Sequence, residues 1–343
     1  MQGKKNTIFL TGATGYIGSH TWCELLEKGY EVIGFDNLSN SFEEVIESVG
    51  KISKKKPYFI HGDVRDTKLL SKIFSENDID AVIHFAALKS VSESNENPLM
   101  YYDVNLNGLI SLIRVMEKHK LKNLVFSSSA TVYGNPKKVP IKENSPLSAT
   151  NPYAQTKLMS EQILRDLEKS SDNWRIAYLR YFNPAGAHKS GLIGEYPIGE
   201  PNNLMPIVSK VAAGKLNKLQ IYGGDYPTKD GTGIRDYIHV MDLAEGHVSA
   251  LSKLFYCNNS FTVNLGTGLG YSVLDIINTY EKVSGCSIPY EISSRREGDV
   301  AICYADIKLA IKLFDWQPKR GLEEMCFDSW NWQKRSLNGI SET

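Results

Sequence analysis

Short apolar runs alternate with longer amphipathic stretches over the first half of the chain. The apolar runs, which predict strands, lie at 7–10, 31–35, 58–60, 81–85, 123–126 and 176–180. The amphipathic stretches, which have helical spacing, lie at 17–28, 68–76, 99–119 and 153–169. Strands that alternate with helices need crossover connections, so the pattern predicts an α/β fold with a doubly wound parallel sheet. Because the strand segments are almost continuously apolar, both faces of this sheet should be covered by helices.

The pattern changes after Pro184. Gly and Pro become frequent over 185–206 and 223–233, and the remaining helical stretches lie at 204–213, 241–254 and 273–283. A length of 343 residues suggests about two domains. We therefore expect one domain over 1–184 and a smaller α+β domain over 185–343, with some later segments returning to the first. Its long loops are typical of binding loops.

Composition excludes several classes of protein. Lys plus Arg and Asp plus Glu are both 39, and this balance disfavours a nucleic-acid-binding surface. The five cysteines are scattered, with no Cys-x-x-Cys pair, so neither a disulfide framework nor a metal site is expected. The sequence has neither a signal-peptide core nor an apolar run of about 18 residues. We expect a cytoplasmic protein that does not enter membranes.

Three glycines, Gly12, Gly15 and Gly18, lie between the first expected strand and the first helix. Glycines at such a turn let the backbone approach a pyrophosphate closely, and N–H groups at a helix start bind anions. The spacing Gly-x-x-Gly-x-x-Gly differs from the commoner Gly-x-Gly-x-x-Gly. Its position between a strand and a helix nevertheless predicts a dinucleotide-binding (Rossmann) domain.

Acidic residues near the ends of the next strands support this prediction. Asp36 follows Gly18 by 18 residues, where a carboxylate binds the adenosine ribose hydroxyls and repels a 2′-phosphate. NAD is therefore favoured over NADP. Asp63, expected at the end of the third strand, is placed to reach the adenine edge. Small residues after the fourth strand, at 86 and 87, let the backbone approach the cofactor.

Tyr153 and Lys157 lie one turn apart at the start of an expected helix, behind the start signal Asn151-Pro152. Residues with this spacing share a helix face. A nearby cation favours a phenolate, so we expect Lys157 to lower the tyrosine pKa from about 10. This makes Tyr153 a candidate general base for an alcohol.

A run of three serines at 127–129 follows the fifth expected strand, at the carboxyl edge of the sheet. Ligands of open α/β sheets bind along this edge. The Ser129 hydroxyl would therefore be placed to bind the reacting oxygen and relay its proton. The serine, the Tyr153/Lys157 pair and the glycine turn together predict redox chemistry with a dinucleotide.

These features resemble the extended short-chain dehydrogenase/reductase superfamily, and more narrowly the UDP-glucose 4-epimerase family over nearly the whole chain. The segments that carry the resemblance are YIGSHT at 16–21, VIHFAALK at 82–89, LRYFNP at 179–184, PNNLMP at 201–206, GTGIRDYIHVMDL at 231–243 and RREGD at 295–299. Because they lie in both halves, they are more specific together than any one motif.

The resemblance implies an NAD-dependent isomerase that interconverts UDP-glucose and UDP-galactose through a transient 4-keto sugar. Tyr153 would take the proton of the sugar 4-hydroxyl while hydride passes to NAD. Ser129 would shuttle the proton, and Lys157 would hold the nicotinamide ribose. The resemblance also implies a role in galactose or other carbohydrate metabolism, and a homodimer built from the helices at 99–119 and 153–169.

The resemblance also assigns binding roles. Besides Ser129, Tyr153 and Lys157, the expected cofactor-binding residues are Gly12, Gly15, Tyr16, Ile17, Gly18, Asp36, Asn37, Asn40, Ser41, Asp63, Val64, Phe85, Ala86, Ala87, Lys89, Asn105 and Phe182. The expected substrate-binding residues are Ser129, Thr131, Tyr153, Asn183, Asn203, Leu204, Gln220, Tyr222, Arg235, Tyr237, Arg296, Asp299 and Cys303. Among the latter, Arg235 and Arg296 would clamp the diphosphate, and Asp299 would bind the uridine ribose.

One position separates two substrate classes. Family members restricted to UDP-glucose and UDP-galactose carry a tyrosine four residues after the aspartate of RREGD, whereas this chain has Cys303. The smaller thiol opens space beside the sugar C2 substituent. The chain is therefore expected to act also as a UDP-N-acetylglucosamine 4-epimerase, unless Tyr304 refills that space.

Two other functions stay open at this point. A nucleotide-sugar 4,6-dehydratase shares the first oxidation, but its family carries an Asp-Glu pair where this chain has Ala130 and Thr131. A non-catalytic NAD(H)-sensing protein would keep the fold without needing Tyr153 and Lys157.

Overall fold

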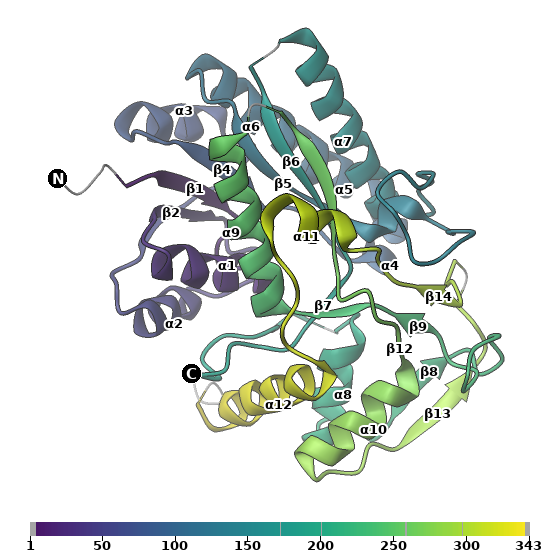
Figure 1. Cartoon of the computed structure of the whole chain (residues 1–343). Helices are drawn as coiled ribbons and strands as arrows, with labels where there is room; N and C mark the ends of the chain where they lie inside the picture. Colours follow the sequence, from purple (N-terminus) through teal and green to yellow (C-terminus); the bar gives the residue numbers. More distant parts are fainter. Residues whose placement is uncertain (1–4, 172, 200, 258, 297, 340–343) are drawn as a thin grey trace. The chain divides into compact units, whose positions relative to one another are not determined.

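The computed structural model describes residues 5–171, 173–199, 201–257, 259–296 and 298–339 (Figure 1). The chain forms two compact units. Unit 1 is drawn from Met1–Gly134, Pro146–Arg180 and Ala244–Val263, and unit 2 from Asn135–Ser145, Tyr181–Leu243 and Asn264–Thr343.

Unit 1 is built on a seven-stranded sheet in the order β11-β6-β5-β4-β1-β2-β3. Its strands are β1 (Thr7–Thr11), β2 (Glu31–Asp36), β3 (Tyr58–His61), β4 (Ala81–His84), β5 (Asn123–Ser129), β6 (Arg175–Tyr181) and β11 (Phe261–Leu265). β1 pairs in parallel with β2 and β4, β2 with β3, and β4 with β5. The predicted doubly wound α/β fold is therefore confirmed. The chain order reverses between β1 and β4, which is where such sheets bind ligands.

Helices cover both faces of this sheet. They are α1 (Tyr16–Glu27), α2 (Glu44–Ser53), α3 (Thr67–Glu76), α4 (Val91–Glu96), α5 (Pro98–Tyr102), α6 (Gly108–Lys118), α7 (Pro152–Ser170) and the part of α9 (Val240–Tyr256) that begins at Ala244. Figure 1 shows α3, α6 and α7 on one face, and α1 and α2 on the other. Strand residues such as Phe9 and Phe126 pack with Leu112 of α6 and Leu164 of α7 in one buried core.

The helix expected at 99–119 is interrupted. The structure has α5, then the π-helical turn η1 (Asp103–Asn107), then α6. Of these three described pieces, only α6 contributes residues to the core beneath the sheet, such as Leu109 and Leu112. The short helices α2 and α4 were also not predicted.

Unit 2 contains small sheets packed with helices. The strands are β7 (Asn183–Ala185), β8 (Leu219–Tyr222), β9 (Ile234–Arg235), β10 (Tyr237–His239), β12 (Tyr271–Ser272), β13 (Tyr290–Ser293) and β14 (Ile302–Cys303). The helices are α8 (Leu204–Ala212), α10 (Val273–Ser284), α11 (Lys308–Phe314) and α12 (Leu322–Gly339). The strands pair as β10-β7, β12-β9-β14 and β13-β8. Residues of α8, α10 and α12, such as Val208, Ile277 and Met325, form its core. The sequence analysis identified α8 and α10 but not α11 or α12.

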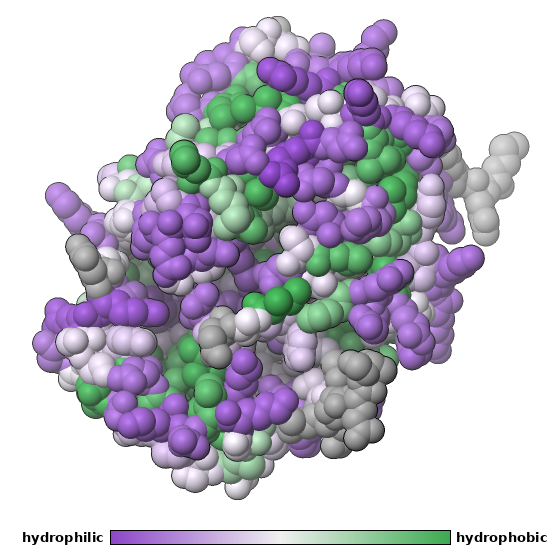
Figure 2. Space-filling view, turned by 180° about the vertical axis from the view of Figure 1, so that it is seen from behind, coloured by the Kyte–Doolittle hydropathy of each residue, from purple (hydrophilic) through white to green (hydrophobic). Residues whose placement is uncertain are grey.

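The described surface is mixed in polarity. On the face drawn in Figure 2, hydrophilic residues are interspersed with smaller hydrophobic clusters. Among the residues that the structure describes, no helix has the length and apolar character needed to cross a membrane.

Candidate active site

The glycine turn that follows β1 is tightly packed. Gly12 has a φ of +69°, and a Cβ there would lie 2.7 Å from the backbone nitrogen of Ala86. A Cβ on Gly18 would lie 1.9 Å from the carbonyl oxygen of Gly12. Gly15 occupies the N-cap position of α1 without a side-chain cap. The first N–H groups of α1, from Tyr16 to Gly18, therefore lie at a helix start suited to an anion.

Asp36 ends β2, as predicted, and joins this turn. Its carboxylate accepts hydrogen bonds from the backbone N–H of Thr14 at 3.1 Å and of Leu38 at 2.9 Å. The Thr14 hydroxyl contacts that of Ser41 at 2.6 Å. The structure thus brings Asp36 and Ser41 to the glycine turn. A carboxylate has about four lone-pair sites, so these two bonds leave Asp36 able to accept ribose hydroxyls.

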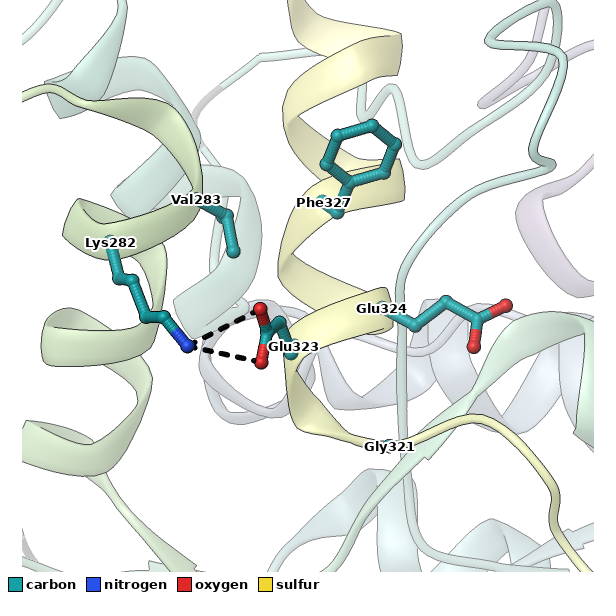
Figure 3. Close-up of a pocket in the computed structure, with 6 residues that line it drawn as sticks. All are labelled: Lys282, Val283, Gly321, Glu323, Glu324 and Phe327. Carbon is teal, nitrogen blue, oxygen red and sulfur yellow. Dashed lines mark hydrogen bonds and ion pairs between the residues drawn. The ribbon is translucent and has the colours of Figure 1, made fainter.

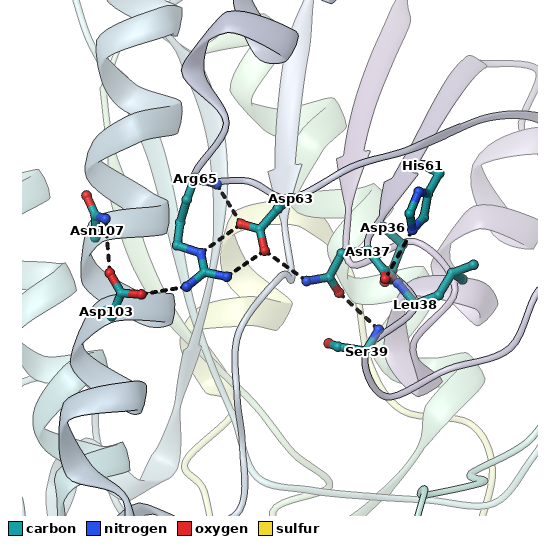
Figure 4. Close-up of polar contacts among 9 residues, drawn as sticks. All are labelled: Asp36, Asn37, Leu38, Ser39, His61, Asp63, Arg65, Asp103 and Asn107. Carbon is teal, nitrogen blue, oxygen red and sulfur yellow. Dashed lines mark hydrogen bonds and ion pairs between the residues drawn. The ribbon is translucent and has the colours of Figure 1, made fainter.

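Asp63 lies in a chain of polar contacts beside Asp36 (Figure 4). β3 ends at His61, so Asp63 lies two residues beyond the strand. The carboxylate of Asp63 accepts from Nε and Nη2 of Arg65, at 2.9 and 2.7 Å, and from Nδ2 of Asn37 at 3.0 Å. These bonds, those of Arg65 above all, hold the pKa of Asp63 well below its usual range. Arg65 also pairs with Asp103 at the start of η1.

Arg65 was missed by the sequence analysis. Through these contacts Asp63 and Arg65 connect the segments that follow β2 and β3 to η1. Contact between Asp63 and the adenine stays a prediction. While Nδ2 of Asn37 donates to Asp63, Oδ1 of the same side chain accepts from Ser39 N–H at 3.1 Å.

Asn105 lies in the π-helical turn and joins two segments. Its Oδ1 accepts from Leu88 N–H at 2.8 Å, and its Nδ2 donates to the carbonyl of Leu88 at 3.1 Å and to the hydroxyl of Thr156 at 2.9 Å. Such π turns are frequent at functional sites. The ammonium of neighbouring Lys89 lies 6.0 Å from the ring centroid of Tyr16. Residues from the glycine turn, the 85–89 segment and α7 are thus linked within unit 1.

The Tyr153/Lys157 pair begins α7 as predicted. The Asn151 side chain caps the helix by accepting from Ala154 N–H at 2.9 Å, and Pro152 occupies its first turn. Both Tyr153 and Lys157 are buried. Lys157 Nζ donates to the carbonyl oxygen of Ser127 at 2.7 Å, and burial lowers the pKa of Lys157 to about 8.

Ser129 ends β5 beside the phenol. Its Oγ accepts from the backbone N–H of Thr131 at 3.2 Å and from the Thr131 hydroxyl at 3.0 Å. With its lone pairs occupied, the Ser129 hydroxyl is left to donate its own proton. The Ser129 hydroxyl acts to lower the pKa of Tyr153, which favours the phenolate.

The prediction that Lys157 lowers the pKa of Tyr153 is wrong when only the groups of the protein are considered. Burial raises the pKa of Tyr153, and the opposing influence comes from Ser129. The physical reason is that desolvation penalises the phenolate, while the Lys157 ammonium is directed at the carbonyl of Ser127.

Unit 2 brings together the charged residues expected to bind the nucleotide. The Asp299 carboxylate lies 3.6 Å from Nη2 of Arg235 and 3.0 Å from Nε of Arg296. The Arg296 guanidinium lies 4.8 Å from the ring centroid of Tyr222. β14 pairs in parallel with β9, with Cys303 opposite Arg235. Side chains directly opposite each other share one face of a sheet, so the thiol lies on the Arg235 side.

Asp236 was missed by the sequence analysis although it follows Arg235. It is fully buried and accepts from Thr267 N–H at 2.7 Å, Gly268 N–H at 3.0 Å and Ala305 N–H at 3.0 Å. The carboxylate thereby ties β9 to the chain just beyond β14. Burial raises its pKa.

The other residues of unit 2 that are expected to bind substrate lie on several different elements. Asn183 on β7 pairs with Tyr237 on β10, and burial raises the pKa of Tyr237 to about 12. Asn203 lies at the N-cap position of α8 but donates to Glu195 at 2.6 Å. Leu204 packs against the core, and Gln220 donates to Ser293. Phe182 is buried.

A surface cavity of about 540 Å³ lies elsewhere in unit 2 (Figure 3). It is lined by Lys282, Val283, Gly321, Glu323, Glu324 and Phe327. The Lys282 ammonium pairs with the Glu323 carboxylate at 3.3 Å. No residue expected to bind cofactor or substrate lines this cavity.

Known proteins are similar to this chain over nearly its whole length. A family model described as GDP-mannose 4,6 dehydratase matches residues 9–328. The UDP-glucose 4-epimerase of Bacillus subtilis is 57% identical over 332 residues, which cover 97% of this chain and 98% of that protein.

Solved structures match as well. The UDP-glucose 4-epimerase from Stenotrophomonas maltophila, with bound NAD and formylated UDP-arabinopyranose, is 47% identical with a TM-score of 0.96, covering 98% of this chain and 99% of that one. The UDP-glucose 4-epimerase from Bifidobacterium longum, in complex with NAD+ and UDP, is 51% identical with a TM-score of 0.93. The match covers 97% of this chain and 100% of that one.

Proposed function

Because the chain belongs to the UDP-glucose 4-epimerase family of extended short-chain dehydrogenases/reductases, we propose that it inverts C4 of UDP-hexoses with NAD as cofactor. The observation that carries this proposal is the buried group Tyr153, Ser129 and Lys157, at the sheet edge that also holds the glycine turn. On this proposal UDP-glucose and UDP-galactose are interconverted.

The residues of unit 1 fit NAD. The glycine turn leaves no room for side chains where the backbone must approach a pyrophosphate, and Asp36 lies beside it as a ribose acceptor. NAD would take up and return the hydride of C4, and its oxidised form would add a positive charge near the phenol. Lys157 would hold the nicotinamide ribose.

Tyr153 has the central proton-transfer role. As the phenolate it would accept the proton of the sugar 4-hydroxyl, and it would return that proton when the opposite face of C4 is reduced. Because burial raises the pKa of Tyr153, the phenolate needs compensating interactions. On this proposal Ser129 would supply one from the protein by donating its hydroxyl proton.

The nucleotide would be held by unit 2. Arg235 and Arg296 present guanidinium groups to the same carboxylate, Asp299, and such planar donors suit a diphosphate. We propose that the two arginines bind the diphosphate and Asp299 the uridine ribose. The sugar needs weaker contacts, because a rigidly held ring could not present both faces of C4 in turn.

Cys303 supports a wider substrate range. Its thiol shares the Arg235 face of the small sheet. The ring of Tyr304 lies beside Gly270, 3.5 Å from where a Cβ on that glycine would be. Neighbouring side chains in an extended segment point to opposite sides, which supports the proposal that Tyr304 leaves the space at Cys303 open. The proposal therefore includes UDP-GlcNAc and UDP-GalNAc as substrates.

The matched family model also raises the 4,6-dehydratase alternative. Elimination of water across C5 and C6 needs an acid and a base next to Ser129. The residues there are Ala130 and Thr131 of η2 (Ala130–Tyr133), and neither ionises near neutral pH. The epimerase proposal is therefore favoured.

Product analysis tests these proposals. The purified chain is given UDP-glucose or UDP-GlcNAc separately, without added NAD, and the sugars are identified after release. We expect the C4 epimer in both cases. A 4-keto-6-deoxy product would support the dehydratase, and no product, with bound NAD left unreduced, would support a sensing protein. The Tyr153→Phe variant should lose at least about 100-fold in kcat.

The assembly and cell compartment are also proposals. Leu99 on α5 is 82% exposed, and Met159 on α7 is 37% exposed. Apolar side chains on these two helices support the homodimer expected from the family. The five cysteines are free in the structure, which suits a reducing compartment such as the cytoplasm.

A further inference from the structure

A buried ion pair lies one helical turn beyond Lys157. Arg180 of β6 donates from Nε to Oε1 of Glu161 at 2.8 Å and from Nη2 to Oε2 at 2.6 Å. Both side chains are only 2% exposed. Burying two charges costs more desolvation energy than an apolar pair of the same volume would. Stability alone therefore does not explain this pair.

Two further bonds connect the pair to its surroundings. The Ser128 hydroxyl on β5 donates to Oε1 of Glu161 at 2.6 Å. Nη1 of Arg180 donates to the Tyr133 hydroxyl at 3.1 Å, and the guanidinium lies 5.0 Å from the Tyr133 ring centroid. The pair thus joins α7, β5, the turn η2 and β6, all within unit 1.

The joined elements carry the catalytic candidates. Ser128 is the backbone neighbour of Ser129, and Tyr153, Lys157 and Glu161 recur along one face of α7. Lys157 bonds the carbonyl of Ser127 at 2.7 Å. The same face of α7 is therefore fixed to the end of β5 at two successive turns. A rotation or slide of α7 that separated Tyr153 from Ser129 would break both connections.

We propose that Glu161 and Arg180 are positioning residues for epimerisation, which hold α7 against β5 so that the Tyr153 phenol meets the Ser129 hydroxyl. This inference rests on the proposed function. The ion pair touches neither cofactor nor sugar on this proposal, and it acts through the geometry of the two groups that move the proton.

The test replaces the pair without leaving a lone buried charge. In the double variant Glu161→Leu/Arg180→Met both charges are removed together, and such replacements are often neutral for folding. Folding is followed by thermal unfolding, and kcat, KM and the pH profile of kcat are measured with UDP-glucose. Arg165→Met is the matched control. Nη2 of Arg165 lies 3.6 Å from the same carboxylate, but the Arg165 side chain is 39% exposed. The Arg165→Met variant should therefore keep kcat within about twofold of the parent.

We expect the folded double variant to lose at least about tenfold in kcat, since small misplacements of reacting groups have large effects on rate. KM should change less than about twofold, because the nucleotide-binding candidates lie in unit 2. The rising limb of the pH profile should move to higher pH as Ser129 stabilises the phenolate less. A folded variant with parental kcat, or with lower kcat and an unmoved pH profile, would overturn the proposal.

If the double variant does not fold, Ser128→Ala decides the question. It removes one link between β5 and Glu161 and leaves the charges paired. We expect a decrease of about three- to tenfold in kcat with the same shift in pH profile, and parental behaviour would overturn the proposal. A parent chain that cannot epimerise UDP-glucose overturns the proposed function itself. An active parent with unaffected variants overturns only the role of the ion pair.

Discussion

Burial and catalysis make opposite demands on Tyr153. The proposed mechanism needs the phenolate, but desolvation raises the pKa of the buried phenol, and the Ser129 hydroxyl is the protein group that opposes this rise. Lys157 is bonded to the Ser127 carbonyl. On the proposed mechanism, Lys157 is therefore expected to hold the nicotinamide ribose rather than to lower the pKa of the phenol.

The Ser129→Ala variant tests this assignment. Because Tyr153 must be ionised to accept a proton, kcat should rise with pH through its apparent pKa. Loss of the Ser129 bond should move that limb to higher pH and lower kcat at pH 7 by about 10- to 100-fold. Part of the activity should return at pH 9. An unshifted limb in the pH profile of kcat would show that Ser129 does not stabilise the phenolate.

The Lys157→Met variant should lose activity but gain stability at pH 7. Burial lowers the Lys157 pKa to about 8 from its ordinary value of 10.5, so the unfolded chain binds the proton more tightly. The resulting destabilisation is complete below pH 8 and disappears as pH rises toward 10.5. Allowing for the lost bond to Ser127, the variant should be about 1–2 kcal/mol more stable at pH 7.

Urea unfolding of the cofactor-free protein at pH 7 and pH 10 measures this effect. The gain from Lys157→Met should shrink at the higher pH, while activity is lost at both. A variant that is less stable than the parent at pH 7 would contradict the assignment of a desolvated cation.

The gate position gives a prediction on specificity. Cys303→Tyr places a phenol on the Arg235 face of the small sheet, next to the proposed sugar site. Turnover of UDP-GlcNAc should fall at least about tenfold while that of UDP-glucose stays within about threefold, as expected for a steric pocket. Equal effects on both substrates, in kcat/KM, would show that Cys303 is not a gate.

Among the secondary-structure elements, the turn from β1 to α1 is the most constrained. Gly12 combines a φ of +69° with a backbone neighbour 2.7 Å from any added Cβ. Gly12→Ala should therefore push the 85–86 segment away and release NAD, with a stability cost of about 1–3 kcal/mol. The measurement is bound NAD after gel filtration, by absorbance of the released cofactor, together with the melting temperature.

Gly29→Ala is the matched control for the glycine turn. Gly29 also has a positive φ, +90°, but nothing lies within 4 Å of an added Cβ. The Gly29→Ala variant should be destabilised by backbone strain but should keep its bound NAD. If both variants lose NAD equally, close packing at Gly12 is not what holds the cofactor.

Some secondary-structure elements could be predicted from the sequence and others could not. The alternation of strands and helices placed β1 to β6, α1, α3 and α7 within a few residues, because apolar periodicity and capping residues such as Asn151 are local signals. The break of 99–119 into α5, η1 and α6 was not visible. Within η1, Asn105 bonds to Leu88 and Thr156, which lie 17 and 51 residues away in the sequence.

At the scale of the whole molecule, assembly is open to a direct test. Leu99→Glu places a charge on a residue that is 82% exposed in a helix proposed to face a second copy. The variant should run as a monomer in light scattering while the parent runs as a dimer. Tyr256→Glu, at a residue 90% exposed at the end of α9, should leave the mass unchanged. A monomeric parent, or a dimeric Leu99→Glu variant, would contradict the proposed interface.

The sequence by itself determined the fold class and the chemical types at the site. Strand and helix periods, the glycine turn, Asp36 and the Tyr153/Lys157 spacing are properties of neighbouring residues, and local rules apply to them. Only the tertiary structure decided the contacts that set their chemistry: burial of Tyr153, the bond from Lys157 to Ser127, the engagement of Asp63 by Arg65, and the Glu161–Arg180 pair. Desolvation and hydrogen bonding depend on what surrounds a side chain in three dimensions, and residues distant in sequence supply those surroundings.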